Sequence, residues 1–221
     1  MDNFHLDTPA LFAGGRLCLD FINTACMRRG VEIEFISDGE ELMRWLRMAE
    51  EVTGTQLCDQ REYREGMLSQ AIELRGALHD LVHSAIEQRP PSAESLQTVN
   101  GILRAAPAYS QIGYERQGFQ ESHGNSRPED QWRMAIAADA VDLLCHSDLS
   151  LLRQCECPSC VRVFYDTTKN HKRRWCVEKC GSAPKAAAYY RRKVAKAAEA
   201  HSKIVEPAAG DALNAGDLRL Q

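Results

Sequence analysis

The residues best suited to chemistry in this sequence are five cysteines that crowd into residues 155–180 of the 221-residue chain. They stand in two short groups, CECPSC at 155–160 and CVEKC at 176–180, with fifteen residues between them. Zn²⁺ binds thiolates well, and two such groups can supply the four ligands of a tetrahedral site. In a reducing cytosol, clustered cysteines indicate metal binding before they indicate a disulfide framework. The spacing therefore predicts one structural zinc ion.

The first cysteine group offers two ways to reach the metal. Cys155 and Cys160 form a C-x4-C pair, whereas Cys157 and Cys160 form a C-x2-C pair, and both spacings suit a zinc knuckle. Cys157-Pro158-Ser159-Cys160 also has the C-x-x-C form of thioredoxin-like redox sites, which need a strand before them and a helix after them. The residues after Cys160 alternate like a strand, so a thiol redox protein is the minor alternative. From the residues alone, the choice of pair stays open.

Charge is distributed unevenly along the chain. The formal net charge is −4, from 27 Lys and Arg against 31 Asp and Glu. Residues 153–196 hold 12 of these basic residues and 3 of the acidic ones, which leaves 15 basic and 28 acidic residues elsewhere. An acidic body joined to a basic C-terminal module is a pattern that indicates nucleic-acid contact.

The basic residues of this module fall into a loop at 169–174 and a predicted helix that follows Ser182. At 100° per residue, Lys185, Tyr189, Arg192 and Lys196 share one face of that helix, which predicts a phosphate-binding stripe. An ordinary solvated helix face is the alternative. The arginines of the loop are the candidates for contacts with base edges. The full set of candidate nucleic-acid-binding residues is Lys172, Arg173, Arg174, Lys185, Tyr189, Arg192, Lys193 and Lys196.

Hydrophobic spacing predicts a mainly helical body upstream of the cysteines. Residues 11–25 read as a strand or the start of a buried helix, and helices are expected over about 37–52, 55–88, 92–104 and 128–147. Ser37 or Asp38 is expected to cap the first of these four helices. Residues 107–127 carry Gly113, Gly118 and Gly124, which predicts a hairpin or an irregular loop.

The fold class that follows is mainly α. We expect a helical N-terminal domain over 1–150, a zinc-bound β-hairpin module with a basic C-terminal helix over 151–203, and a flexible tail over 204–221. In the module, Val161, Val163 and Tyr165 alternate like a strand, and Thr167–Asn170 supplies turn residues, which predicts a hairpin between the two cysteine groups.

Compartment and membrane association can also be predicted from composition. No run approaches the roughly 18–20 consecutive apolar residues of a membrane span. The first fifteen residues carry two aspartates and lack the basic segment of a secretory signal. We therefore expect a cytoplasmic protein without a membrane partner.

Two stretches of the sequence resemble known families. CECPSCVRVFYDTTKNHKRRWCVEKCGSAPKAAAYYRRK resembles the CGNR zinc finger, and LCLDFINTACMRRG resembles the start of the ABATE domain. The signature of that domain matches Leu19, Asp20, Asn23 and Thr24. The resemblance implies a bacterial-type transcription regulator, in which the N-terminal domain senses a small ligand and the finger contacts DNA.

The resemblance also implies which cysteines hold the metal. Its four ligands fall on Cys155, Cys160, Cys176 and Cys180, with Pro158 at the position where the family has proline. Cys157 is then the alternative to Cys155. The chain departs from the family at CGSA, residues 180–183, where the family has Cys-Gly-Asn-Arg. The missing Asn and Arg put in doubt any binding role that they serve in the family.

We therefore predict a zinc-dependent DNA-binding transcription regulator that is not an enzyme. Asn23 and Thr24 are the candidate ligand-binding residues for a small-molecule effector, with a helix cap or a turn as their alternative role. The alternative function is a small-molecule-binding or adaptor protein in which zinc only staples the module and DNA is not bound. The sequence is compatible with a homodimer and leaves the oligomeric state open.

Overall fold

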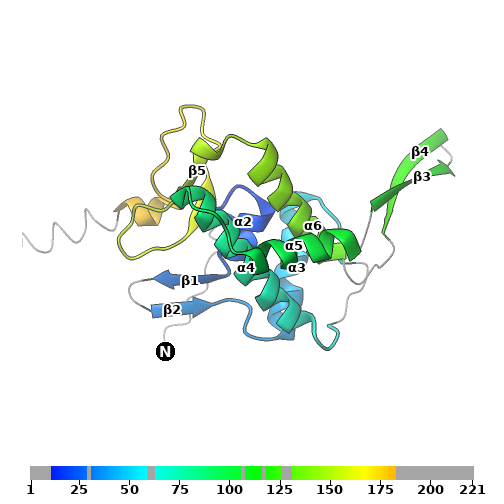
Figure 1. Ribbon diagram of the computed structural model, residues 1–221, viewed down its shortest axis with the longest axis horizontal. Coiled ribbons are helices and arrows are strands. Elements are labelled where there is room, and N and C mark those ends of the chain that lie inside the picture. Colours follow the sequence, from blue (N-terminus) through cyan, green and yellow to red (C-terminus); the bar gives the residue numbers. More distant parts are fainter. Residues whose placement is uncertain are drawn as a thin grey trace, which may run out of the picture. The chain divides into compact units, whose positions relative to one another are not determined.

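The computed structural model describes residues 11–28, 31–58, 63–105, 108–115, 118–125 and 131–182 (Figure 1). Residues Met1–Gly181 form one compact unit, and a second unit begins at Ser182. The predicted tail at 204–221 and nearly all of the predicted basic helix therefore lie outside the described residues. Among the helices of the described part, none is both long enough and apolar enough to cross a lipid bilayer.

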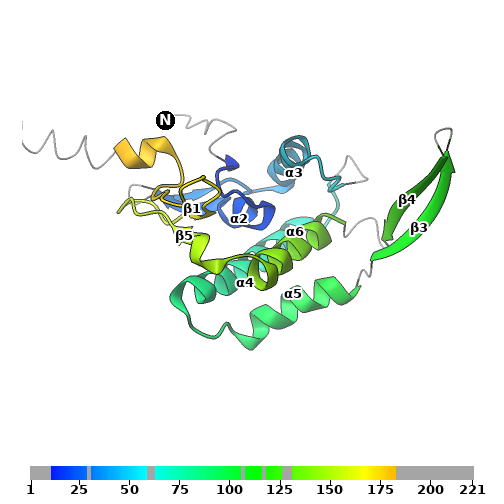
Figure 2. The same cartoon turned by 90° about the horizontal axis from the view of Figure 1, so that it is seen from above.

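Five α-helices among the described residues make up the body of the first unit. They are α2 at Leu17–Ile22, α3 at Gly39–Thr53, α4 at Met67–Glu87, α5 at Ala93–Ala105 and α6 at Gln131–Val141. Helices α4, α5 and α6 pack against one another, and α2 packs on α4 and α6. Viewed from above, α5 lies on the far side of α4 and α6 from α2 (Figure 2).

The core lies around α2. Phe21 packs against Trp45 of α3, with ring centroids 5.3 Å apart, and against Trp132 of α6 at 6.3 Å. All three rings are almost completely buried, and every residue of α2 is buried. Apart from Asp20, α2 is apolar on all sides, and such a helix must be enclosed by other elements.

Helix α3 begins and ends where the sequence predicts. The Asp38 side chain accepts a hydrogen bond from the Glu41 N–H at 2.9 Å, which is the expected N-cap. Gly54, with φ 68°, ends the helix in the left-handed conformation that glycine adopts without strain. The predicted cap is thus confirmed for Asp38.

The predicted helix over 55–88 is wrong at its beginning, because α4 starts only at Met67. The Glu50 carboxylate accepts hydrogen bonds from the N–H groups of Leu57 (2.7 Å) and Cys58 (2.8 Å) and holds this segment out of helical conformation. Leu57 is fully buried there, so its burial against other elements outweighs local helix propensity.

The predicted helix over 128–147 also differs from the structure. Its α-helical part, α6, ends at Val141 and continues as a π-helical turn, η2, at Asp142–His146. A short 3₁₀ turn, η3, follows at Leu149–Leu151.

The described strands form three antiparallel hairpins. They are β1 at Ala25–Arg28 with β2 at Val31–Glu34, β3 at Ala108–Glu115 with β4 at Gly118–Asn125, and β5 at Leu152–Gln154 with β6 at Val163–Tyr165. The hairpin predicted within 107–127 is confirmed as β3–β4, whereas β1–β2 was not predicted.

The hairpin of the cysteine module encloses the first cysteine group. Strand β6 pairs with β5, which precedes Cys155, with Gln154 opposite Val163. The prediction that a hairpin lies between the two cysteine groups is therefore wrong in its pairing. The predicted strand, β6, pairs with β5, which lies upstream of the first cysteine group. The fold class is confirmed: a mainly helical chain with a small β-hairpin beside the clustered cysteines.

Candidate metal centre and its seat on the helical body

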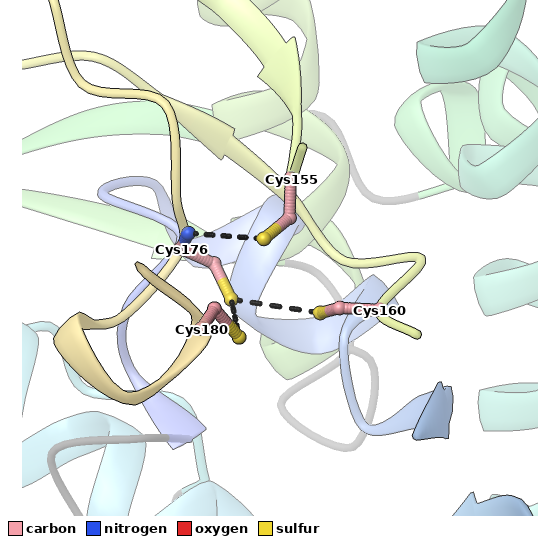
Figure 3. Close-up of side chains that lie close together, drawn as sticks. All are labelled: Cys155, Cys160, Cys176 and Cys180. Carbon is pink, nitrogen blue, oxygen red and sulfur yellow. Dashed lines mark hydrogen bonds between the residues drawn. The ribbon is translucent and has the colours of Figure 1, made fainter. Parts of the chain in front are cut away.

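Four buried thiols meet in the module. The Sγ atoms of Cys155, Cys160, Cys176 and Cys180 all lie within 4.8 Å of one another (Figure 3). The Cys160–Cys176 and Cys176–Cys180 Sγ distances are both 3.7 Å. A tetrahedral ZnS₄ centre with Zn–S bonds of about 2.3 Å places its sulfurs about 3.8 Å apart. The donor set and its spacing therefore fit one structural zinc ion.

Backbone hydrogen bonds bring the two cysteine groups together. The Cys155 N–H donates to the Arg162 carbonyl at 2.8 Å, and the Cys160 N–H donates to the Cys157 carbonyl at 2.9 Å, which closes the first turn. The Cys176 N–H donates to the Cys155 Sγ at 3.4 Å, and hydrogen bonds of this kind stabilise a thiolate. The second group leads into a helical segment that begins at residue 178 and carries Cys180.

Cys157 is buried as well but takes no part in the four-thiol cluster. Its Sγ lies 3.5 Å from the Ser159 hydroxyl. The Cys157–Cys160 pair of the redox interpretation is therefore split in the structure, with Cys160 facing the other cluster thiols.

The cluster thiols differ in their proton affinity. Hydrogen bonds from Cys160 and Cys176 lower the pKa of Cys155, whereas hydrogen bonds with Cys155 and Cys160 raise the pKa of Cys176. Burial, followed by the charge on its neighbours, raises the pKa of Cys180 to about 12. Zinc must displace protons from the thiols that keep them, so its affinity for the cluster falls as the pH is lowered.

The Asn23 side chain joins the helical body to the module. Its Nδ2 donates to the Val163 carbonyl at 2.8 Å, and its Oδ1 accepts from the Val163 N–H at 3.0 Å. All of these atoms are buried, and 140 residues separate the two partners. The side chain thereby acts as a neighbouring strand would, and it satisfies the free edge of β6.

A turn at residues 13–15 forms the second contact between body and module. The buried Asp20 carboxylate accepts from the Gly14 N–H at 2.7 Å and holds this turn. The Gly14 carbonyl then accepts from the Tyr165 N–H at 2.7 Å. Gly15, with φ 77°, lies so close that an added Cβ would meet the Tyr165 carbonyl at 3.0 Å, which favours glycine there.

Thr24, the other candidate ligand-binding residue, is also engaged within the protein. Its hydroxyl donates to the Phe21 carbonyl at 2.7 Å and accepts from Arg75 at 2.9 Å. Arg75 also forms an ion pair with Glu34 of β2. The polar side-chain atoms of Asn23 and Thr24 thus bond to the protein itself, and a ligand at these two residues stays a prediction.

Arg173 and Arg174, the candidates for base-edge contacts, have different surroundings. The Arg173 guanidinium donates to the carbonyls of Ala13 (2.8 Å), Trp175 (3.0 Å) and Cys176, and lies 4.5 Å from the centroid of the Phe164 ring. This side chain therefore cross-links the module to the turn at 13–15. Arg174 is exposed but forms an ion pair with Glu156.

The loop between the cysteine groups presents lysines to solvent. The buried Asp166 orders this loop by accepting hydrogen bonds from the N–H groups of Thr168 (3.0 Å) and Arg173 (2.8 Å). Although burial opposes it, these hydrogen bonds lower the pKa of the Asp166 carboxyl. Lys169 and Lys172 are exposed on the loop. The remaining candidates, Lys185, Tyr189, Arg192, Lys193 and Lys196, lie outside the described residues.

Comparison with known families decides where this chain belongs. A family model described as "ABATE: Putative stress-induced transcription regulator" matches residues 15–147, which is more than half of the chain. The chain belongs to the ABATE family. The model of the CGNR zinc finger matches residues 152–193, directly after the ABATE region. Neither description is of an enzyme. A search of curated proteins finds no match to the chain.

The two family regions meet along the contacts described above. Asp20 and Asn23, two residues of the ABATE signature, hold the turn and the strand edge against which the CGNR finger packs. The other two, Leu19 and Thr24, are completely buried beside them. We infer that the signature provides the seat for the finger.

Replacing Asn23 by alanine tests this seat. Because Asn23→Ala leaves a buried N–H and a buried carbonyl of Val163 without partners, we expect the free energy of unfolding to fall by about 2–4 kcal/mol. Urea unfolding followed by circular dichroism measures the change. The matched control, Asn100→Ala on the exposed surface of α5, should shift it by less than about 0.5 kcal/mol. If Asn23→Ala lowers the free energy of unfolding by no more than this control, the inference that Asn23 holds the finger is wrong.

The buried Asp20 predicts a pH dependence of stability. Burial, the largest influence, raises the pKa of its carboxyl from 3.8 to about 7. The folded protein thus binds a proton that the unfolded chain releases near pH 4, so this contribution to stability is full below pH 4 and lost as the pH rises to about 7. We expect Asp20→Asn, which keeps the acceptor for Gly14, to reduce the fall in unfolding free energy between pH 5 and pH 8. If the unfolding free energy of Asp20→Asn falls as much as that of the wild type, the raised pKa of Asp20 does not cause the fall.

Proposed function

We propose that this ABATE protein is a zinc-dependent DNA-binding transcription regulator. The observation that carries the proposal is the outward placement of lysines on a finger whose inward side is fixed to the body. Lys169 and Lys172 are exposed on a loop that Asp166 orders, between the two cysteine groups in the sequence. Exposed cations on an ordered loop are suited to contacts with phosphate groups, which supply most of the affinity of DNA-binding proteins.

Charge distribution supports the same proposal. The module spanning 153–196 has a formal excess of nine positive charges, and the rest of the chain has an excess of thirteen negative charges. An acidic body repels DNA, which restricts binding to the face of the finger. The candidates Lys185, Tyr189, Arg192, Lys193 and Lys196, four of them basic, follow later in the same basic stretch of the sequence. Arg173 serves the structure of the finger in this proposal and does not read bases.

The zinc ligands we propose are Cys155, Cys160, Cys176 and Cys180, with Cys157 as a neighbouring thiol outside the coordination shell. The support is the clustering of the first four Sγ atoms within 4.8 Å. The zinc is structural: it joins two cysteine groups that are far too small to hold a fold by apolar burial alone. Four thiolates complete a tetrahedral zinc shell and leave no coordination position open for a substrate.

Single cysteine substitutions test this choice of ligands. We expect wild-type protein and Cys157→Ser to bind one zinc per chain, and Cys155→Ser to bind far less, because three thiolates leave the tetrahedral shell incomplete. Inductively coupled plasma mass spectrometry on protein purified without added zinc measures the ratio. If Cys157→Ser loses zinc while Cys155→Ser keeps it, the C-x2-C pair is the correct one.

Salt-dependent binding to random-sequence duplex DNA tests the function. We expect Lys169→Glu/Lys172→Glu to weaken binding at least tenfold at low salt, and to reduce the slope of log K against log salt by about two. Fluorescence anisotropy measures both. The matched control, Arg44→Glu/Arg47→Glu on the exposed face of α3, should bind like the wild type. If the wild type fails to bind DNA even at low salt, the proposal is wrong.

The second candidate function is an adaptor or small-molecule-binding protein that does not contact DNA. Two observations favour it. Residues 182 and 183 are Ser and Ala where the CGNR family has Asn and Arg. In addition, Arg173 and Arg174 both form contacts within the protein. The salt titration distinguishes the two functions, because only the first predicts binding to DNA.

A further inference from the structure

The helical body contains an apolar pocket away from the zinc cluster. Its volume is about 320 Å³, within the range of pockets that take small organic molecules. Leu81 and Ala85 of α4, Leu96 and Val99 of α5, and Leu144 and Leu149 beyond α6 line it. Leu96 and Leu149 are 43% and 38% exposed, respectively, which is unusual for leucine side chains that face one hollow.

The charges around the pocket restrict the kind of molecule that fits it. Among the described residues that line it, Arg89 is the only charged one. That guanidinium already forms ion pairs with Asp80 at 3.0 Å and with Glu87 at 2.7 Å, so it offers little to an anion. None of the described lining residues is a carboxylate that could attract a cation. Ser84, Asn100 and Cys145 are the uncharged polar residues of the lining.

The wall of the pocket is built by an irregular segment that leads to the zinc cluster. Leu144 and Cys145 belong to the π-helical turn η2, and π-turns within helices occur often at functional sites. From η2 the chain passes through η3 and β5 directly to Cys155. On the N-terminal side of η2, the Asp139 carboxylate of α6 accepts a hydrogen bond from the Cys18 N–H of α2 at 2.8 Å. The pocket wall is thus connected to the finger through β5 and to the finger's seat through α2.

We propose that this pocket binds an uncharged, mostly apolar small molecule, and that this molecule is the effector of the regulator. The effector role rests on the proposed function, whereas binding in the pocket does not. Because Leu144 and Leu149 belong to the segment that ends at β5, filling the pocket acts on the strand that pairs with β6 of the finger. The pocket lies apart from Asn23 and Thr24, whose polar atoms hold the finger and its surroundings.

A neutral fluorescent probe tests the pocket without reference to DNA. N-Phenyl-1-naphthylamine, which is uncharged and fluoresces in apolar surroundings, should bind the full-length, zinc-loaded protein saturably. Leu96→Asp places a charge in the pocket at a half-exposed position, and should weaken binding at least tenfold. The matched control, Ile72→Asp, changes a 51% exposed residue of α4 outside the pocket lining and should leave binding unchanged.

Further variants and probes separate the outcomes. Leu149→Asp repeats the test should Leu96→Asp alter the circular dichroism spectrum. Equal binding by the wild type and both pocket variants, or tighter binding of an anionic anilinonaphthalene sulfonate, overturns the proposal. It is also overturned if the wild type sediments as a dimer that Leu96→Asp dissociates, since a second copy then covers the pocket. Loss of DNA binding alone leaves the probe result standing, so binding in the pocket and the proposed function fail independently, while the effector role falls with either.

Discussion

The Asn23 side chain donates to the carbonyl of Val163 and accepts from its N–H, and the packing of the finger on the helices depends on this pair of hydrogen bonds. Within the part of the chain that the structure describes, β6 pairs with one strand, β5, so its other edge needs partners away from water. A primary amide has a donor and an acceptor side by side in one plane, as a peptide group does. Asn23 is the C-cap residue of the buried helix α2, and the core around Phe21 fixes its position.

The finger therefore has an inward and an outward side with different chemistry. Inward, Arg173 bonds to three backbone carbonyls and covers Phe164, a role that needs the several donors of a planar guanidinium. Outward, Lys169 and Lys172 remain exposed on the loop that Asp166 orders. Counting basic residues along the sequence cannot distinguish the structural role of Arg173 from the exposed positions of the two lysines, since all three residues belong to the same basic segment. The separation matters for the proposed function, in which the exposed lysines, and not Arg173, would contact phosphate groups.

Zinc and the helical body stabilise different parts of the finger. The four-thiol cluster ties the two cysteine groups to each other, while Asn23, Asp20 and Gly14 tie β6 and its loop to α2. The π-turn η2, two of whose residues line the apolar pocket, is joined to β5 of the finger by a short stretch of chain.

The sequence by itself determined the features that depend on near neighbours in the chain. The spacing of CECPSC and CVEKC predicted a four-cysteine zinc site, Ser37 or Asp38 predicted a helix start, and the glycines of 107–127 predicted a hairpin or an irregular loop. Tertiary structure alone decided the roles of Asn23, Thr24 and Arg173, because their partners lie up to 160 residues away in the chain. It also decided that α4 begins late, where the Glu50 carboxylate holds the backbone of Leu57 and Cys58. Local propensity is worth less than a kilocalorie or so per residue, and burial of distant partners outweighs it.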